Sequence, residues 1–169
     1  MSVKICHASI DERGRISGGV PGDQTGREVC VRSWYNKPWQ YYIECTDQAL
    51  GSRAAQLFLE ICNSNRCGYD QSNRMTLYEA LKANGGKVEG MAYCEADCSS
   101  AVATIYHILG LDVNPACTTR NLRPALAATG QFQVYSDYAH ISSDAYARKG
   151  GLYLKEGSHV VMAVEDGSA

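Results

Sequence analysis

Hydrophobic and polar residues alternate in short runs early in the chain and then take up a helical spacing. Two strands are predicted around a turn at Pro38, at residues 29–35 and 40–45. Thr46 or Asp47 can cap the helix that follows, in which apolar residues recur every three or four positions up to Cys62. Residues 7–28 and 63–73 are rich in Gly, Asp, Asn and Arg and therefore predict loops and turns.

The rest of the chain predicts more helices and then a sheet. Helices are expected at residues 76–83, 97–109 and 120–128, each followed within two residues by a glycine that can end it. Apolar segments predict strands at residues 132–135, 152–154 and 159–164, the last two joined by a hairpin at 155–158. Helices followed by a small antiparallel sheet indicate an α+β domain.

Length and charge narrow the class of protein. A chain of 169 residues fits one domain, with an N-terminal loop and strand segment over 1–45 and helices and sheet over 46–169. The net charge of -2 excludes the basic surface expected of a nucleic-acid binder. No apolar stretch approaches the roughly 20 residues that span a bilayer, and the start lacks a signal-peptide pattern. We therefore expect a protein made in the cytoplasm, without membrane insertion, and we expect it to be a monomer.

Eight cysteines raise the question of disulfides or metal. They are Cys6, Cys30, Cys45, Cys62, Cys67, Cys94, Cys98 and Cys117. Without an export signal, mostly reduced thiols are expected. There is no paired CxxC motif and the four histidines are scattered, so the spacing argues against structural zinc. We predict no metal and no cofactor.

Cys98 is the cysteine best placed for chemistry. Asp97 is a good N-cap residue, which puts Cys98 in the first turn of the predicted helix at 97–109. Unpaired backbone N–H groups and the helix dipole stabilise a thiolate there, and the same N–H groups can hold an oxyanion. The alternative is a cysteine that acts only as a small buried hydrophobe.

His159 is the predicted base. It begins the strand at 159–164, where a strand end can face a helix N-terminus and bring a Cys–His pair together. His107 points to the opposite face of the helix from Cys98. His7 falls in an N-terminal segment predicted to be loose, and His140 in a short segment of uncertain structure. Glu165 shares the face of His159 but lies about 20 Å along the strand, so the residue that orients the imidazole stays unassigned. A surface histidine at a hairpin is the alternative.

These residues together resemble a known family. Residues 96–100 (Ala-Asp-Cys-Ser-Ser) are similar to the nucleophile motif of NlpC/P60 peptidoglycan hydrolases and their CHAP relatives. Residues 149–154 and 157–161 resemble their strand pair that ends in Gly-His-Val. Residues 18–29, with the aromatic residues that follow, look like the start of bacteriophage endolysins from Gram-positive hosts. The ordered set covers most of the chain.

The resemblance implies a papain-like NlpC/P60 fold, in which a helix bearing Cys98 packs on a small antiparallel sheet bearing His159. It implies hydrolysis of a peptidoglycan amide bond through an acyl-enzyme, an antimicrobial activity of a protein that is made in the bacterial cytoplasm and lyses the cell wall after release. Endolysins usually carry a separate wall-binding domain, and we expect none in this sequence. In that reading Tyr69 lines the site beside the thiol. The further candidates for substrate contact are Asp70, Gln71, Asp23, Gln24, Trp34 and Tyr35.

Two departures from the family pattern stand out. Gly151 occupies a position where the family often has Asp, which affects how the strand pair is fixed. The chain also ends ten residues after His159, whereas the family's third polar residue commonly follows on the next strand. Either the orienting residue comes from elsewhere, or the chain stops at a domain edge.

Several functions stay open on sequence alone. The same Cys–His pair serves an N-acetylmuramoyl-L-alanine amidase and an endopeptidase, so the bond cut is not fixed. A protein-directed cysteine protease or transglutaminase-like enzyme would use the same chemistry on another substrate. A non-catalytic wall-binding module held by disulfides is the third reading, and it would leave no free nucleophile.

Overall fold

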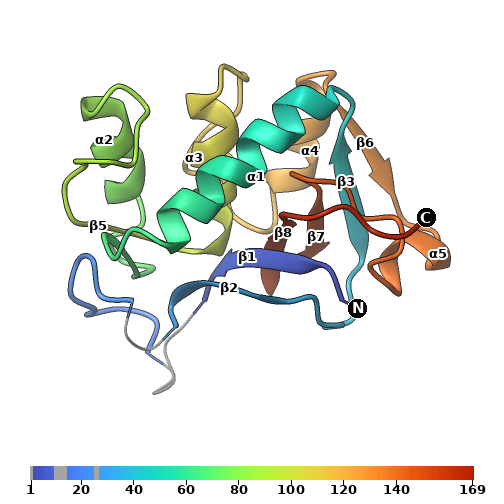
Figure 1. The fold of residues 1–169 in the computed structure, drawn as a ribbon, viewed down its shortest axis with the longest axis horizontal. Helices are drawn as coiled ribbons and strands as arrows, with labels where there is room; N and C mark the ends of the chain where they lie inside the picture. Colours follow the sequence, from blue (N-terminus) through green and yellow to red (C-terminus); the bar gives the residue numbers. More distant parts are fainter. Residues whose placement is uncertain (1, 10–14, 25–26) are drawn as a thin grey trace.

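The computed structural model describes residues 2–9, 15–24 and 27–169, which form a helical layer packed on an antiparallel sheet (Figure 1). The large sheet has six strands in the order β2-β1-β8-β7-β3-β6, and each neighbouring pair is antiparallel. Its strands are β1 (Lys4–Ala8), β2 (Val29–Ser33), β3 (Tyr41–Cys45), β6 (Phe132–Tyr135), β7 (Leu152–Lys155) and β8 (His159–Ala163). A second, small sheet pairs β4 (Cys67–Tyr69) with β5 (Cys94–Ala96) in parallel.

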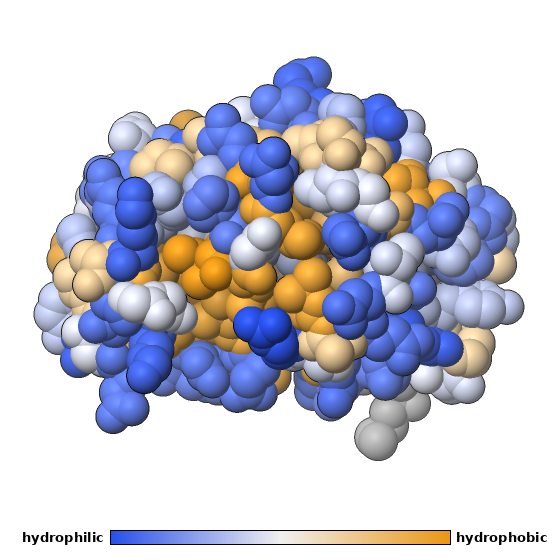
Figure 2. All heavy atoms as spheres, turned by 90° about the horizontal axis from the view of Figure 1, so that it is seen from above, coloured by the Kyte–Doolittle hydropathy of each residue, from blue (hydrophilic) through white to orange (hydrophobic). Residues whose placement is uncertain are grey.

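The helices are α1 (Gln48–Cys62), α2 (Thr76–Ala83), α3 (Cys98–Ile108), α4 (Leu122–Ala128) and the short α5 (Tyr138–Ile141). Helices α1 to α4 gather on one side of the large sheet, whereas the short α5 packs by Ile141 against an aromatic cluster on the other face. Figure 2 looks onto this helical side, where hydrophobic side chains gather in the middle and hydrophilic ones surround them. Among the described residues, none of the helices has the length and apolar character needed to cross a bilayer.

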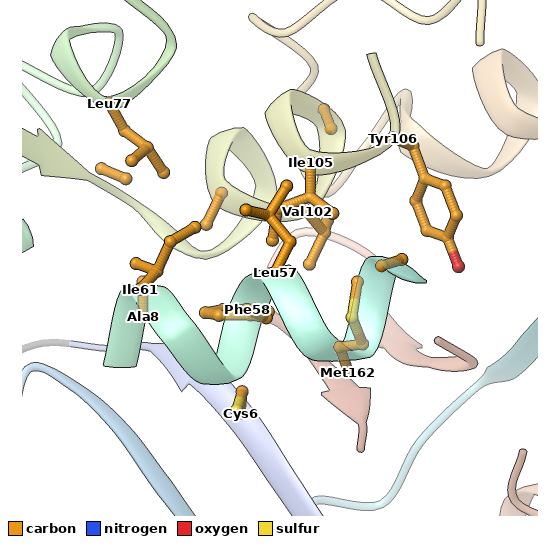
Figure 3. Close-up of a cluster of buried hydrophobic side chains, with 14 of the residues drawn as sticks. Cys6, Ala8, Leu57, Phe58, Ile61, Leu77, Val102, Ile105, Tyr106 and Met162 are labelled. Atoms are coloured by element: carbon orange, nitrogen blue, oxygen red, sulfur yellow. The ribbon is translucent and has the colours of Figure 1, made fainter. Parts of the chain in front are cut away.

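The main core lies between the helices and the sheet. Phe58 and Ile61 of α1 pack with Val102 and Ile105 of α3, close to Met162 of β8 (Figure 3). All five side chains are buried, and burying each contributes about 1.5–3 kcal/mol relative to exposure. This packing holds α3 against β8, so the first turn of α3 lies near the start of β8.

The opposite face of the sheet carries an aromatic cluster. Trp39, Tyr42 and Tyr153 pack there, and the Tyr42 and Tyr153 ring centroids are 4.8 Å apart. Side chains of β8 alternate between the two faces, since Val161 belongs to this cluster and Met162 to the main core. His159, two positions before Val161, therefore lies on the same face of the sheet as the aromatic cluster.

Most predicted elements are confirmed. The Asp47 side chain caps α1 by accepting hydrogen bonds from the N–H groups of Ala49 and Leu50. The helices predicted at 76–83, 97–109 and 120–128 are present, with ends that differ by at most two residues. The hairpin at 155–158 closes with a bond from the Ser158 N–H to the Lys155 carbonyl. The α+β class is borne out by these helices and the antiparallel sheet.

The prediction of loop over residues 7–28 is wrong at its start. Residues 4–8 form β1, a strand inside the sheet that pairs with β2 on one side and β8 on the other. The sheet therefore does not simply follow the helices, because strands from both ends of the chain lie side by side. The loop predicted at 63–73 likewise contains β4. Gly26, part of the predicted turn region, lies outside the described residues.

Steric crowding by Tyr42 explains why position 151 is a glycine. A Cβ at Gly151 would collide with the ring and hydroxyl of Tyr42. That hydroxyl accepts a hydrogen bond from the Arg148 N–H at 2.8 Å and donates to Glu44 Oε1 at 2.9 Å. An aspartate therefore has no room here, and the Tyr42 hydroxyl itself fixes the segment that leads into β7.

Candidate active site

A cleft of about 510 Å³ opens where α3 and β8 begin. It is lined by His7, Ser9, Ile16, Arg32, Tyr35, Lys37, Tyr69, Gln71, Asp97, Cys98, Ser99, Thr118, Thr119, Gly157, Ser158 and His159. The predicted nucleophile and base thus line the same cleft, one from the helical layer and one from the sheet. Its remaining walls come from β1, the segment after β2, and the loop that follows α3.

Cys98 is the first residue of α3, as the sequence predicts. A capping box precedes it, in which Asp97 Oδ1 accepts from the Ser100 N–H and the Asp97 N–H donates to Ser100 Oγ, both at 2.9 Å. The backbone N–H groups of Ser99 and Val160 face the thiol and favour its anion. Burial outweighs them and, with the charge of Asp97, raises the pKa of Cys98 to about 12. The resting group is therefore a neutral thiol.

Arg74 braces the start of α3, a role that the sequence did not indicate. Its Nε lies 2.7 Å from Asp97 Oδ2, and one terminal nitrogen donates to Ser99 Oγ at 3.1 Å. The guanidinium also donates to the carbonyls of Ala116 and Cys117. One side chain therefore ties the helix start to the loop that forms the far wall of the cleft.

His159 is held by a second histidine. Its Nε2 lies 3.1 Å from Nδ1 of His7, and its ring stacks on Trp39 with centroids 6.3 Å apart. Cys6 of β1 is paired with Met162 of β8, so His7 sits diagonally across from His159 on the same face of the sheet. His7 is buried in β1, which corrects the prediction of a loose N-terminal histidine.

Both histidines are neutral at ordinary pH. Burial, followed by the charges of Lys37 and Arg32, lowers the pKa of His159 to about 4. Burial and the neighbouring His159 lower the pKa of His7 to about 3. The Tyr35 hydroxyl lies 3.0 Å from the same Nδ1 of His7 that faces His159. A proton on His159 Nε2 would be donated to His7 Nδ1, which leaves Nδ1 of His159 as the free basic nitrogen.

Three of the predicted substrate-contact residues line the cleft. Gln71 Nε2 donates to the Tyr69 hydroxyl at 2.8 Å, and Tyr69 lies close enough for the Cys98 charge to affect its titration. Burial is the main reason that the pKa of Tyr69 rises to about 12. Tyr35 lines the same cleft and contacts His7. These neutral hydroxyl and amide groups can donate to and accept from a peptide.

The other predicted contacts lie elsewhere, because their side chains hold loops or pack in the core. Asp70 is buried and accepts from the N–H groups of Gly18 and Ser72. Gln24 donates to the carbonyls of Val29 and Cys62. These bonds anchor the backbone, and neither side chain is among the residues that line the cleft.

Trp34 and Asp23 are also separate from this cleft. The Trp34 ring packs edge-on against Tyr153, with centroids 5.7 Å apart, in the aromatic cluster. Asp23 lines a smaller cavity of about 220 Å³, which Tyr69 also borders. Trp34 is thus a packing residue, and Asp23 belongs to a neighbouring hollow.

The remaining candidate bases are elsewhere in the fold. His107 Nδ1 lies 3.0 Å from the Val113 carbonyl, and His140 Nδ1 lies 2.7 Å from Asp137. Neither lines the cleft. Glu165 accepts from the Lys4 N–H at 2.8 Å, so its carboxylate is bound at the start of β1 and does not line the cleft with His159.

All eight cysteines are free thiols in this structure. Cys67 and Cys94 are register partners across the β4–β5 pair, a pairing that sequence spacing did not suggest. Within the described ranges, no three or more His, Cys, Asp or Glu side chains cluster as a metal site would require.

Comparison with known proteins gives a family. A family model described as "Endolysin-like domain" matches residues 5–169. The chain therefore belongs to the endolysin-like domain family, which suggests a cell-wall lytic function with peptidoglycan as substrate. Neither the curated proteins nor the solved structures that were searched include a match to this chain.

Proposed function

We propose that the protein is a cysteine hydrolase that cleaves an amide bond of bacterial peptidoglycan. The observation that carries the proposal is that Cys98 and His159 line the same cleft, with His7 Nδ1 at 3.1 Å from His159 Nε2. The endolysin-like family supports the substrate, and the thiol at a helix start supports the reaction type. The papain-like NlpC/P60 arrangement of a cysteine helix against a histidine sheet is part of this proposal.

The chemistry starts from two neutral groups. The thiol of Cys98 and the imidazole of His159 are both uncharged at rest, since burial raises one pKa and lowers the other. His159 then acts as general base through Nδ1 and takes the thiol proton as the sulfur attacks the amide carbon. Backbone N–H groups of the first turn of α3 stabilise the oxyanion that forms.

The second half of the reaction reverses the roles. The imidazolium of His159 protonates the leaving amine, and the peptide acyl group stays on Cys98 as a thioester. Water attacks this thioester while His159 again accepts a proton, which releases the acid and restores the thiol. His7 is the positioning residue that holds His159 Nε2 throughout. The scheme fits both an endopeptidase and an N-acetylmuramoyl-L-alanine amidase.

Digestion of purified Gram-positive peptidoglycan tests the proposal. The native protein should release stem peptides or shortened muropeptides that mass spectrometry identifies, and the products name the bond that is cut. Cys98→Ala should release none. Cys45→Ala is the matched control, because Cys45 is also buried but lies in β3 and does not line the cleft.

The competing readings predict different results. A protein-directed protease would degrade denatured proteins and leave walls intact. A wall-binding module would sediment with the walls and release nothing, with Cys98 no more reactive to iodoacetamide than Cys45. Either pattern would contradict the hydrolase proposal.

A further inference from the structure

Two cationic side chains border the cleft on the side of His159. Arg32 of β2 and Lys37 of the β2–β3 connection both line it, and both residues are exposed. In the part of the chain that the structure describes, no carboxylate forms a salt bridge with either of them. Their charges reach the base, since both lower the pKa of His159, although burial has the larger effect.

The described part of the cleft lining carries a positive balance that the whole molecule lacks. Among the described lining residues the one carboxylate is Asp97, which is paired with Arg74 at 2.7 Å. With His7 and His159 neutral, Arg32 and Lys37 give these described residues a net positive charge. The full chain has a net charge of -2. Such a local excess within a concave site attracts anionic ligands.

The guanidinium of Arg32 stacks on the Tyr35 ring, and among the described residues none accepts a hydrogen bond from it. It lies 4.5 Å from the centroid of the Tyr35 ring, and the Tyr35 hydroxyl bonds to His7. A cation–π contact orients the planar group, while its N–H fork stays available for the two oxygens of a carboxylate. The stack therefore places a carboxylate-binding group beside the histidine pair.

We propose, on the basis of the hydrolase function above, that Arg32 and Lys37 form a carboxylate subsite. The preferred substrate is then an acidic peptide, with a free carboxylate next to the amide bond that Cys98 attacks. An amide or ester in place of this carboxylate removes the charge that the two side chains recognise.

A carboxylate bound at the subsite also changes the pKa of His159, the proposed base. His159 faces His7, Tyr35 and Trp39 on the sheet side, and Cys98 with the Asp97–Arg74 pair across the cleft. A bound carboxylate would offset Arg32 and Lys37, so the pKa of His159 rises and its neutral form becomes a stronger base. An acidic substrate thus strengthens the base that takes the proton from Cys98.

Binding to the Cys98→Ala variant tests the subsite without catalysis. The probes are two synthetic peptides that differ only in a glutamate carboxylate or its carboxamide. Calorimetry should show the acidic peptide binding roughly tenfold more tightly, the factor expected from one charge-assisted hydrogen bond. The preference should shrink near 1 M salt, where the Debye length falls to about 3 Å. NMR titration should show the pKa of His159 rising with the acidic peptide alone.

Substitutions then assign the effect to the two cations. Arg32→Gln with Lys37→Met, added to Cys98→Ala, should bind both peptides equally. Arg53→Gln with Lys87→Met removes the same charges from exposed positions outside the cleft and should keep the preference. Equal binding of the two peptides before any cation is removed would overturn the subsite.

Cleavage by the native protein separates this inference from the hydrolase proposal. If the native protein cleaves both peptides at equal kcat/KM, the hydrolase function stands and the carboxylate subsite is refuted. If it cleaves neither, while Cys98→Ala binds the acidic peptide selectively through Arg32 and Lys37, the subsite stands and the hydrolase function fails.

Discussion

At the scale of single residues, His7 is the side chain on which the proposed mechanism depends most after the Cys–His pair. Its Nδ1 lies 3.1 Å from His159 Nε2, and in the proposed mechanism it accepts the proton of Nε2, so that Nδ1 of His159 is the basic nitrogen. We expect His7→Ala to lower kcat on peptidoglycan fragments by about 100-fold, the low end of what a positioned general base contributes. KM should change little, because the thiol and the cations stay in place.

Conservative and distant variants provide the controls for His7. His7→Asn keeps a side-chain acceptor and should recover part of the lost kcat. His140→Ala removes a histidine outside the cleft and should leave kcat unchanged. An equal loss in His7→Asn and His7→Ala, together with a raised KM, would indicate a collapsed site and contradict the positioning role.

The candidate site was predictable in part. Cys98 follows a capping residue and His159 follows a hairpin, and both signals are local in the sequence. His7 and Arg74 act on residues far along the chain, at separations of 152 and 23 positions. The contacts of His7 and Arg74 with the site could not be predicted without the fold. Gln24 and Asp70, which were also predicted as substrate contacts, lie outside the cleft, because polar side chains in glycine-rich loops often bind backbone groups.

At the scale of elements, the start of α3 depends on a clamp formed outside the helix. Arg74 pairs with Asp97, and their side chains are 18% and 14% exposed. We expect Arg74→Met to lower the free energy of unfolding by about 1.5–3 kcal/mol, as for loss of hydrogen bonds to a charged group. Activity should fall as well, since the loop at Cys117 loses its tie to the helix start.

Urea unfolding and peptidoglycan digestion measure the two effects of the clamp. Arg53→Met is the matched control on the exposed surface of α1, where a change within about 0.5 kcal/mol is expected. An Arg74→Met protein as stable and as active as the control would show that the capping box alone holds α3.

The contrast between local signals and long-range contacts also explains which helices and strands could be predicted from the sequence. α1 and α3 carry their own caps and a helical spacing of apolar residues, so their ends could be placed closely. β1 has five residues and β4 has three, and their pairing partners lie far along the chain. In β1, a histidine at a buried position also hides the apolar pattern of the strand. That histidine is the one that contacts His159.

At the scale of the whole molecule, the cleft joins the two ends of the chain. β1 and β8 are neighbours in the sheet, and α3 from the middle of the sequence packs against β8. The cleft therefore exists only in the complete fold, and its two buried histidines are groups of the folded core as well as of the site. The chemistry of the cleft and the stability of the molecule should respond to pH through the same residues.

The stability of the protein should therefore fall in mild acid. The pKa values of His159 and His7 are lowered to about 4 and about 3, against about 6.5 in an unfolded chain. Below pH 6.5 the unfolded chain binds protons that the folded protein cannot, so the stabilisation is complete above pH 6.5 and is lost towards pH 4. Between pH 7 and pH 5 this linkage removes about 2 kcal/mol for each histidine.

Urea unfolding at pH 7 and pH 5 measures this loss. In the His7→Gln/His159→Gln variant the two titrating groups are gone, so its free energy of unfolding should drop less between these pH values than that of the native protein. His140→Gln, which removes a histidine outside the core, should keep the native slope. Equal slopes for the native protein and the double variant would mean that the pair is solvated and protonates freely. The neutral base on which the proposed mechanism rests would then be absent below pH 6.5.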